Sequence, residues 1–235
     1  MLENIKSKPI LFNTAMVQAI LDGRKTVTRR DPFNFLMKPG YNPDWSGYSL
    51  GEYFTGHIET GVCLYSRGAH DVWGVRSNVV KPKYQIGDIL WVREKFNNTE
   101  TTSILYAADR EFTGLGCKEV DGYMFMESEV RWRPSIHMPK EAARIFLKIT
   151  DVRVERLQDI TNDQADKEGF KSVPCTNCHG LGCSDCAGSG MQEPGIVGFM
   201  HVWNSTIKKK DITDFRWDAN PFVWVIEFER CENAI

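Results

Sequence analysis

The sequence predicts an α+β fold in which many strands form a β-barrel and a few short helices lie at its rim. Two observations favour this class: segments with the residue pattern of strands occur along most of the chain, and segments with helical spacing are few and short. The chain has 235 residues, of which 42% are hydrophobic, so it can bury a substantial core. We therefore expect one domain over residues 1–235, interrupted by two insertions.

The first expected element is a short helix near the start of the chain. Asn13 or Thr14 can cap its N-terminus, its apolar residues share one face, and Gly23 can end it in the left-handed conformation. Farther along, Gly87 and Asp88 form a turn signal in front of an alternating segment. Strands are predicted over residues 61–65, 89–93, 103–107, 144–154 and 222–229.

Two further helices are expected in the second half of the chain. Thr161 is followed three residues later by Gln164, which is the pattern of a capping box, and Gly169 ends that short helix. Residues 195–207 carry apolar residues at helical spacing. Three tryptophans within periodic apolar segments are assigned to the core: Trp91, Trp203 and Trp224.

Residues 31–82 depart from this regular pattern. They are rich in Gly, Pro, Asn and Tyr and show weak periodicity. A stretch of this kind is typical of a long loop insertion, which would either cover a substrate as a flap or be a variable excursion.

Composition limits the location and the partners of the protein. No run of about 18 apolar residues is present, so we expect no membrane span. The polar N-terminus lacks the apolar core of a signal peptide. The net charge of −2 argues against a protein that coats nucleic acid through bulk charge, so any nucleic-acid site must be a local patch.

The second insertion, at about residues 172–192, holds a tight cluster of cysteines. Its sequence is two copies of C-x-x-C-x-G-x-G laid end to end. Paired cysteines two residues apart can bind one metal from a tight turn, and the glycines let the backbone fold back around it. Four thiolates give a closed tetrahedral site, so we predict a small structural zinc knuckle; the alternative is a loop of free thiols. The predicted ligands are Cys175, Cys178, Cys183 and Cys186.

Cysteine usage also indicates the cellular compartment. The chain has seven cysteines, an odd total, and only one cluster among them. This distribution fits a reducing compartment with a metal site better than a disulfide framework. We therefore expect a cytoplasmic protein.

Two basic stretches are candidate ligand-binding segments. Four cations occur within the seven residues 24–30, directly after the first helix, and they repel one another unless an anion is near. A phosphate or a carboxylate would relieve this repulsion; the alternative is a solvated surface loop. In the second stretch, Arg131 and Arg133 flank Trp132, an arrangement that suits phosphate contact and base stacking, although such a tryptophan is more often a core residue.

Several motifs together resemble the ASCH domain family of the PUA-like superfamily, in the form carried by bacteriophages and prophages. They are G-R-K-T-V-T-R-R at 23–30, G-D-I-L-W-V-R-E at 87–94, W-R-P-S-I-H-M-P at 132–139, L-Q-D-I-T at 157–161 and F-V-W-V-I-E-F at 222–228. The resemblance leaves out both insertions. It implies a PUA-like β-barrel whose cleft faces RNA, DNA or a nucleotide. The expected ligand-binding residues are Arg24, Arg29, Arg30, Arg131 and Arg133.

One branch of that family removes the acetyl group from acetylated cytidine with a lysine, a threonine and a glutamate. The motif G-R-K-T-x-T places the lysine on Lys25 and the threonine on Thr28, and counting from the helix cap at Thr161 places the glutamate on Glu168. Thr28 would be the nucleophile and Lys25 its base, since neighbouring arginines favour the neutral amine. Glu168 would carry or orient a proton. The alternative is that Glu168 only orders the loop by pairing with Lys25 or a neighbouring arginine.

Three functions therefore follow from the sequence as hypotheses, and whether the protein is an enzyme stays open. The first is a nucleic-acid or nucleotide-binding module, for which binding should depend steeply on salt. The second is an amidohydrolase acting on an acylated cytosine, whose turnover should disappear in Thr28→Ala. The third is a phage interaction protein whose knuckle and 31–82 insertion dock a host protein.

Overall fold

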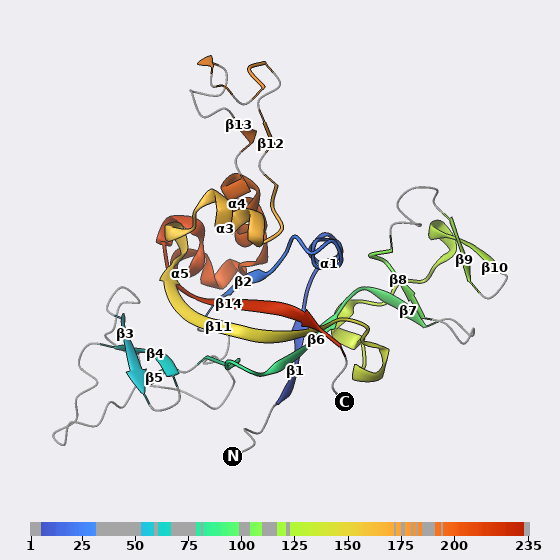
Figure 1. Cartoon of the computed structure of the whole chain (residues 1–235), viewed down its shortest axis with the longest axis horizontal. Helices are drawn as coiled ribbons and strands as arrows, with labels where there is room; N and C mark the ends of the chain where they lie inside the picture. The colour runs from blue at the N-terminus through green and yellow to red at the C-terminus, as the bar shows by residue number, and fades with distance from the viewer. Residues whose placement is uncertain are drawn as a thin grey trace. The chain divides into compact units, whose positions relative to one another are not determined.

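The fold combines a mixed five-stranded sheet with few, short helices, as the computed structural model shows (Figure 1). The strand order is β1-β6-β11-β14-β2. β1 pairs with β6 in parallel, whereas β11 pairs with β6 and β14 pairs with β2 in antiparallel orientation. The bounds are β1 Ser7–Leu11, β2 Val27–Arg30, β6 Ile89–Arg93, β11 Phe146–Arg156 and β14 Phe222–Cys231.

The structure describes residues 6–31, 53–58, 61–66, 79–80, 82–98, 104–109, 117–120, 123–171, 173–174, 177–179, 181, 183–184, 191–193 and 195–232.

The predicted α+β class is confirmed. Among the described residues the sheet has two ends, β1 and β2, and no pairing there joins them, so the closed barrel stays a prediction. None of the described helices has the length and hydrophobicity needed to cross a bilayer.

The chain divides into two compact units, each built from separate stretches of sequence. The first unit comprises residues 1–26, 87–149 and 228–235, and the second comprises residues 27–86 and 150–227.

In the first unit, helix α1 (Thr14–Leu21) begins and ends as predicted. The side chain of Asn13 accepts a 2.8 Å hydrogen bond from the N–H of Met16, and Gly23 ends the helix with a φ of 73°. The first unit also contains four short strands and three 3₁₀ turns. These are β7 Phe96–Asn98, β8 Ile104–Tyr106, β9 Cys117–Val120, β10 Tyr123–Met126, η2 Glu127–Glu129, η3 Ser135–His137 and η4 Lys140–Ala142.

Three small apolar clusters are described in the first unit, and further residues of α1, β6 and β11 are also buried there. Trp91 packs with Ile89 and Phe146, and Phe96 packs with Met138 and Ala142. The third cluster contains Leu105 and Val130. The burial of Trp91 confirms its assignment to the core.

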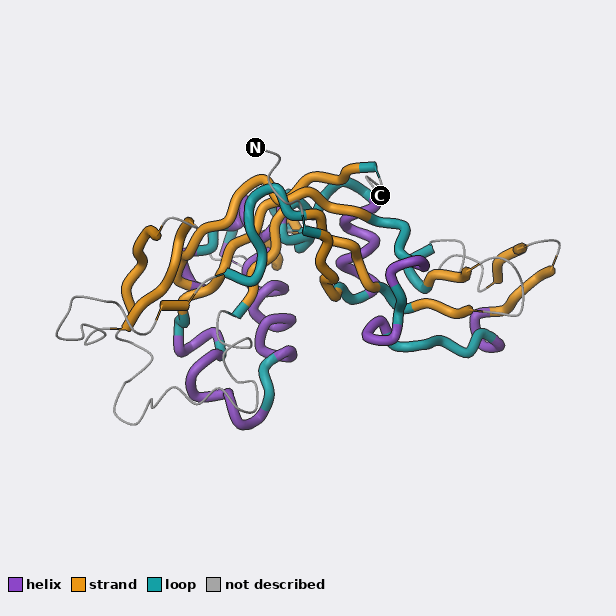
Figure 2. The backbone as a smooth tube through the Cα atoms, turned by 90° about the horizontal axis from the view of Figure 1, so that it is seen from below, coloured by secondary structure: helices purple, strands orange, loops and turns teal. Residues whose placement is uncertain are grey.

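The second unit has one larger core, which lies between β2, β14 and the helices. The elements are η5 Leu157–Asp159, α3 Asn162–Lys167, α4 Gly195–Thr206, η7 Lys209–Asp211, α5 Ile212–Phe215 and η8 Trp217–Ala219. Figures 1 and 2 show these helices gathered together beside the strands. The buried residues of this core are Val27, Leu157, Ile160, Ala165, Phe199, Trp203, Val223 and Val225. Trp203 and Trp224 are buried, as predicted.

Both predicted insertions contain small antiparallel sheets. In the first, β3 Tyr53–Ile58, β4 Gly61–Ser66 and β5 Val79–Val80 pair in that order, which confirms the strand expected at 61–65; residues 32–52 lie outside the described part. In the second, β12 (Val173–Pro174) pairs with β13 (Met191–Glu193). The cysteine segment therefore leaves and returns through a two-stranded neck.

One local expectation is wrong. The cationic run at 24–30 was expected to be a loop, but its second half is strand β2. The physical reason is that Val27 and Thr28 are β-branched, and the strand finds hydrogen-bonding partners on β14.

Candidate functional site

Strand β2 places the second half of the cationic run at one end of the sheet. Successive side chains of a strand point to opposite faces, so Val27 and Arg29 share one face and Thr28 and Arg30 share the other. Val27 belongs to the apolar core that also contains Phe199 of α4. Arg29 therefore points into the packed side of the unit, beneath α3 and α4.

The guanidinium of Arg29 has no exposed surface and is held by three side chains. Its Nη2 donates to Glu155 Oε2 at 3.0 Å and to Gln164 Oε1 at 2.9 Å, and its Nη1 lies 3.4 Å from Glu168 Oε1. The guanidinium carbon lies 6.0 Å from the centre of the Phe199 ring. The Nε of Arg29 is buried and has no hydrogen-bond partner among the described residues. A buried arginine of this kind costs free energy unless it is paired, and two carboxylates pair it here.

Helix α3 positions Glu168. The capping box is present: Gln164 N donates to Thr161 Oγ1 at 3.2 Å, and Thr161 N donates to Gln164 Oε1 at 3.0 Å. Glu168 is the C-cap residue and is 2% exposed, and Gly169 then leaves the helix with a φ of 96°. Glu168 therefore lies buried and forms an ion pair with Arg29. An ion pair between Glu168 and a neighbouring arginine is the alternative to catalysis that follows from the sequence.

Glu155 connects this cluster to a more exposed group of charges on β11 and β14. Its Oε1 accepts from Arg153 Nε at 2.6 Å, while its Oε2 accepts from Arg29. Burial lowers the pKa of Arg153, but the hydrogen bonds that Arg153 donates to Glu155, Asp151 and Glu227 outweigh that effect and raise it. Glu155 is thus held on both sides by arginines.

The other two residues of the predicted triad are also buried. Thr28 is 3% exposed, on the face of β2 opposite to Arg29. Lys25 is 2% exposed; its N–H donates to the carbonyl of Ala19 at 3.0 Å, and its Nζ lies 5.4 Å from the centre of the Phe12 ring. Lys25 belongs to the first unit, whereas Thr28 and Glu168 belong to the second, so the triad as a set stays a prediction.

The remaining cations of the first basic stretch differ in their surroundings. Arg24 pairs with Asp22, with 3.0 Å between Nη2 and Oδ2, so its charge is matched locally. Burial lowers the pKa of Arg30, while Tyr84 and Glu168 act in the opposite direction.

The second basic stretch lies in the first unit, and its arginines are exposed. The backbone of Arg133 forms an antiparallel bridge with Phe96, with N–O distances of 2.7 and 3.3 Å. Trp132 is half-buried and packs against the cluster of Leu105 and Val130, in agreement with a core role. Arg131 and Arg133 are thus available to solvent, but no described contact assigns them a ligand.

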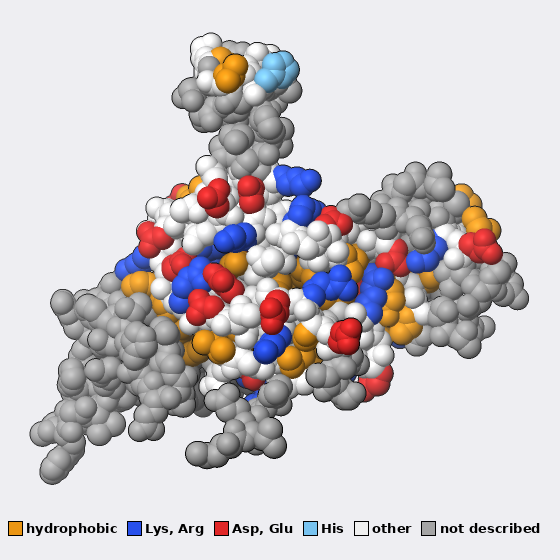
Figure 3. Space-filling view, viewed as in Figure 1, with side chains coloured by type: hydrophobic (Ala, Val, Ile, Leu, Met, Phe, Trp, Pro, Cys, Tyr) orange, Lys and Arg blue, Asp and Glu red, His pale blue; other side chains and the backbone are white. Residues whose placement is uncertain are grey.

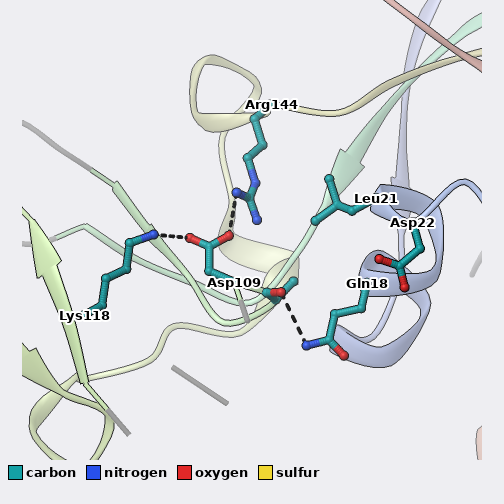
Figure 4. Close-up of a pocket in the computed structure, with 7 residues that line it drawn as sticks. Gln18, Leu21, Asp22, Asp109, Lys118 and Arg144 are labelled. Atoms are coloured by element: carbon teal, nitrogen blue, oxygen red, sulfur yellow. Dashed lines mark hydrogen bonds and ion pairs between the residues drawn. The ribbon is translucent and has the colours of Figure 1, made fainter. Parts of the chain in front are cut away.

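A pocket of about 390 Å³ in the first unit was not foreseen from the sequence (Figure 4). Asp109 lies at its centre, 2.7 Å from both Lys118 and Arg144. Arg144 also donates to both carboxylate oxygens of Glu94, at 2.9 and 3.0 Å. The charged residues of the lining are thus two cations, Lys118 and Arg144, and two carboxylates, Asp22 and Asp109, so their formal charges cancel. The lining residues are Gln18, Leu21, Asp22, Ala108, Asp109, Lys118 and Arg144.

The cysteine cluster is described in part. Cys178 and Cys183 are half-buried, whereas Cys175 and Cys186 lie outside the described residues. After Cys178 the chain turns sharply: His179 has a φ of 48°, and the N–H of Leu181 donates to the carbonyl of Cys178 at 3.0 Å. A tight turn at a cysteine pair fits the requirement of a zinc knuckle. Within the described residues no group of three or more potential metal ligands is gathered, since only two of these cysteines are among them.

The charges of the described surface do not form a large basic area in the view of Figure 3. Basic and acidic side chains alternate on this face.

In the part of the chain that is described, seven polar or charged residues are buried, and four of them are Lys25, Thr28, Arg29 and Glu168. Sequence reasoning named these four, but it missed Glu155 and the contact of Gln164 with Arg29. These partners lie 126 and 135 residues from Arg29, so no local pattern could reveal them.

Comparisons with protein-family models, with curated proteins and with solved structures find no match to this chain.

Proposed function

We propose that this protein is an ASCH-type, PUA-like protein that binds a nucleotide or a modified nucleobase. The observation that carries the proposal is the burial of the motif at 23–30: Lys25, Thr28 and Arg29 are each no more than 4% exposed. A solvated surface loop, the alternative for an arbitrary cationic run, would leave such side chains in water. Buried polar and charged groups are costly, and they concentrate at functional sites.

This burial favours a compact ligand over the backbone of a long nucleic acid. Side chains that contact backbone phosphates lie at the surface and usually form a basic patch. Here the net charge is −2, and Arg24 and Arg29 are already paired with acidic residues. RNA or DNA would then be recognised through one base, with Arg131 and Arg133 as candidate phosphate contacts.

The experiment is a binding panel measured by isothermal titration calorimetry. Cytidine, acetylated cytidine, a mononucleotide, single-stranded RNA and single-stranded DNA are titrated at low and at high salt. We expect binding of a nucleoside-sized ligand with little salt dependence, weakened at least about tenfold in Lys25→Met. Lys167→Met, which changes an exposed lysine on α3, is the matched control and should bind as the wild type does. Failure of the wild type to bind any member of the panel would contradict the proposal.

A second candidate function is hydrolysis of acetylated cytidine, because the threonine, lysine and glutamate that such chemistry needs are all buried polar residues. The hydroxyl of Thr28 would attack the acetyl carbonyl while the Lys25 amine takes its proton. Lys25 would then give this proton to the exocyclic nitrogen of cytidine as the C–N bond breaks, which leaves the acetyl group on the threonine oxygen. Water would then release acetate. Conversion of acetylated cytidine to cytidine by the wild type and not by Thr28→Ala, followed by mass spectrometry, would distinguish this function from binding alone.

We also propose that Cys175, Cys178, Cys183 and Cys186 bind a structural zinc ion. The support is the spacing of the four cysteines, the turn that follows Cys178, and the β12–β13 neck of the segment. The zinc would hold the knuckle folded and would take no part in the chemistry at Thr28.

A further inference from the structure

The described contacts of Arg29 all lie within its own unit, and they reach both ends of α3. Gln164 stands in the first turn of the helix, and Glu168 is its C-cap. A helix of six residues is too short to be stable by itself and depends on tertiary contacts. The guanidinium therefore holds the helix that carries Glu168.

The direction of the side chain excludes Arg29 from the face of β2 that Thr28 occupies. Adjacent residues of a strand point to opposite faces, so a ligand that contacts Thr28 lies across the strand from the Arg29 side chain. Glu168 differs in this respect, because it bonds to Arg29 and is also the third residue of the set proposed with Lys25 and Thr28. Glu168 is thus the group through which Arg29 can affect a ligand.

The charges around the guanidinium explain how it is fixed. Glu155 is held by Arg153 at 2.6 Å and holds Arg29 at 3.0 Å, so the side of the guanidinium that faces Glu155 is anchored. Gln164 accepts from the same nitrogen at 2.9 Å. Nη1 is then directed at Glu168, at the longer distance of 3.4 Å.

We propose that Arg29 is a positioning residue: with Gln164, it holds the Glu168 carboxylate in place for the ligand and does not contact the ligand itself. This inference rests on the proposed function. It gives Arg29 a role different from the ligand contact expected from its sequence motif.

A double-mutant cycle tests the proposal, with affinity for acetylated cytidine as the readout, or for single-stranded RNA if the binding panel selects that ligand. The variants are Arg29→Lys, Glu168→Gln and the pair together. We expect each single variant to weaken binding about tenfold, and the double variant to bind within about twofold of Glu168→Gln, because Arg29 acts through Glu168. Losses that multiply to about a hundredfold would show an independent contact, through Nε for example, and would overturn the proposal.

The controls separate positioning from a loss of fold and from failure of the proposed function. Lys167→Met changes an exposed lysine on α3 and leaves the contacts of Arg29 intact, so its affinity should stay within about twofold of the wild type. If Arg29→Lys loses its near-ultraviolet circular dichroism, Gln164→Met replaces it in the cycle with the same expected result. A wild type that binds no member of the panel would refute the proposed function, whereas binding with an additive cycle would refute only the role of Arg29.

Discussion

Arg29 donates a 2.9 Å hydrogen bond to the side-chain oxygen of Gln164, and that same oxygen accepts the N–H of Thr161. One oxygen thus completes the capping box of α3 and ties the helix to strand β2. The link joins residues 135 positions apart, so it forms only when the second unit has folded. The stability of α3 and the placement of Glu168 are therefore coupled to the sheet.

Removal of the Arg29 charge should strongly destabilise the protein. Arg29→Met leaves two carboxylates without their guanidinium, and Glu168 is 2% exposed. Breaking a buried ion pair on one side costs about 3 to 5 kcal/mol. Urea denaturation followed by circular dichroism measures the free energy of unfolding. Arg24→Met is the matched control, because its pair with Asp22 is more exposed and should contribute about 1 kcal/mol or less. Equal losses in the two variants would contradict the buried network.

Loss of the cap at the start of α3 should have a smaller effect. Thr161→Ala removes the oxygen that accepts the N–H of Gln164 at 3.2 Å, and such a change costs about 1 kcal/mol. Thr161→Ser keeps the hydroxyl and should be close to the wild type. Hydrogen exchange of the α3 amides, measured by mass spectrometry, should increase in the alanine variant only. Unchanged protection in Thr161→Ala would mean that tertiary contacts alone hold the helix.

Much of the fold could be predicted from the sequence because its signals are local. Asn13 and Gly23 bound α1, and Thr161 with Gln164 bounds α3, since caps act over a few residues. The strand over 89–93 follows a Gly-Asp turn, which is also a local signal. These predictions needed no knowledge of distant partners.

The remaining features depend on contacts between distant segments. The cationic run reads as a loop in the sequence because its four charges outweigh the strand preference of its β-branched residues Val27 and Thr28. Its strand conformation requires β14 as a partner. The pocket around Asp109 takes residues from α1 and from segments about 90 or more positions away. The candidate residues Lys25, Thr28 and Glu168 came from a motif, but the buried state of all three became visible only in the structure.

Burial of Glu94 should make the stability of the protein depend on pH. Burial raises the pKa of this carboxyl above its ordinary value of 4.5, against the hydrogen bonds of Arg144, which lower it. At Arg144 the hydrogen bonds and charges of Glu94 and Asp109 outweigh burial and raise its pKa. The Asp109 carboxylate acts on both groups, because it favours the charged form of Arg144 and disfavours the charged form of Glu94. Folded protein then binds the proton of Glu94 more tightly than unfolded protein does.

The sign of the pH effect follows from this difference in proton binding. The contribution of Glu94 is fully present below its unfolded pKa and is lost as the pH rises through the folded pKa. From about pH 4 to about pH 7, the wild type should therefore lose stability relative to Glu94→Gln, as measured by urea denaturation of both proteins at each pH. A relative gain of the wild type over this range would show that the pair with Arg144 outweighs burial.

Zinc content should identify the ligands of the proposed knuckle. Freshly purified protein is expected to contain about one zinc ion per chain, because four thiolates complete a tetrahedral site. Cys178→Ser should lower the content and speed release to a chelator. Cys231→Ser is the matched control, since Cys231 lies in the first unit on β14 and packs against Trp91 and Phe146. Far less than one zinc in the wild type would refute the assignment.

The two glutamates that share Arg29 provide the sharpest test of hydrolysis against binding. Glu155 and Glu168 both accept from the same guanidinium, at 3.0 and 3.4 Å, but the proposed hydrolysis assigns chemistry to Glu168 alone. If the protein hydrolyses acetylated cytidine, Glu168→Gln should lower kcat at least about a hundredfold, as removal of a general acid or base does, with little change in KM. Glu155→Gln removes a similar charge from the surroundings of Arg29 and should leave kcat within about threefold of the wild-type value.

Equal losses of kcat in Glu155→Gln and Glu168→Gln would mean that the charge balance at Arg29, and not proton transfer by Glu168, determines the rate. Loss of affinity in Glu168→Gln without turnover in any variant would instead support the binding function.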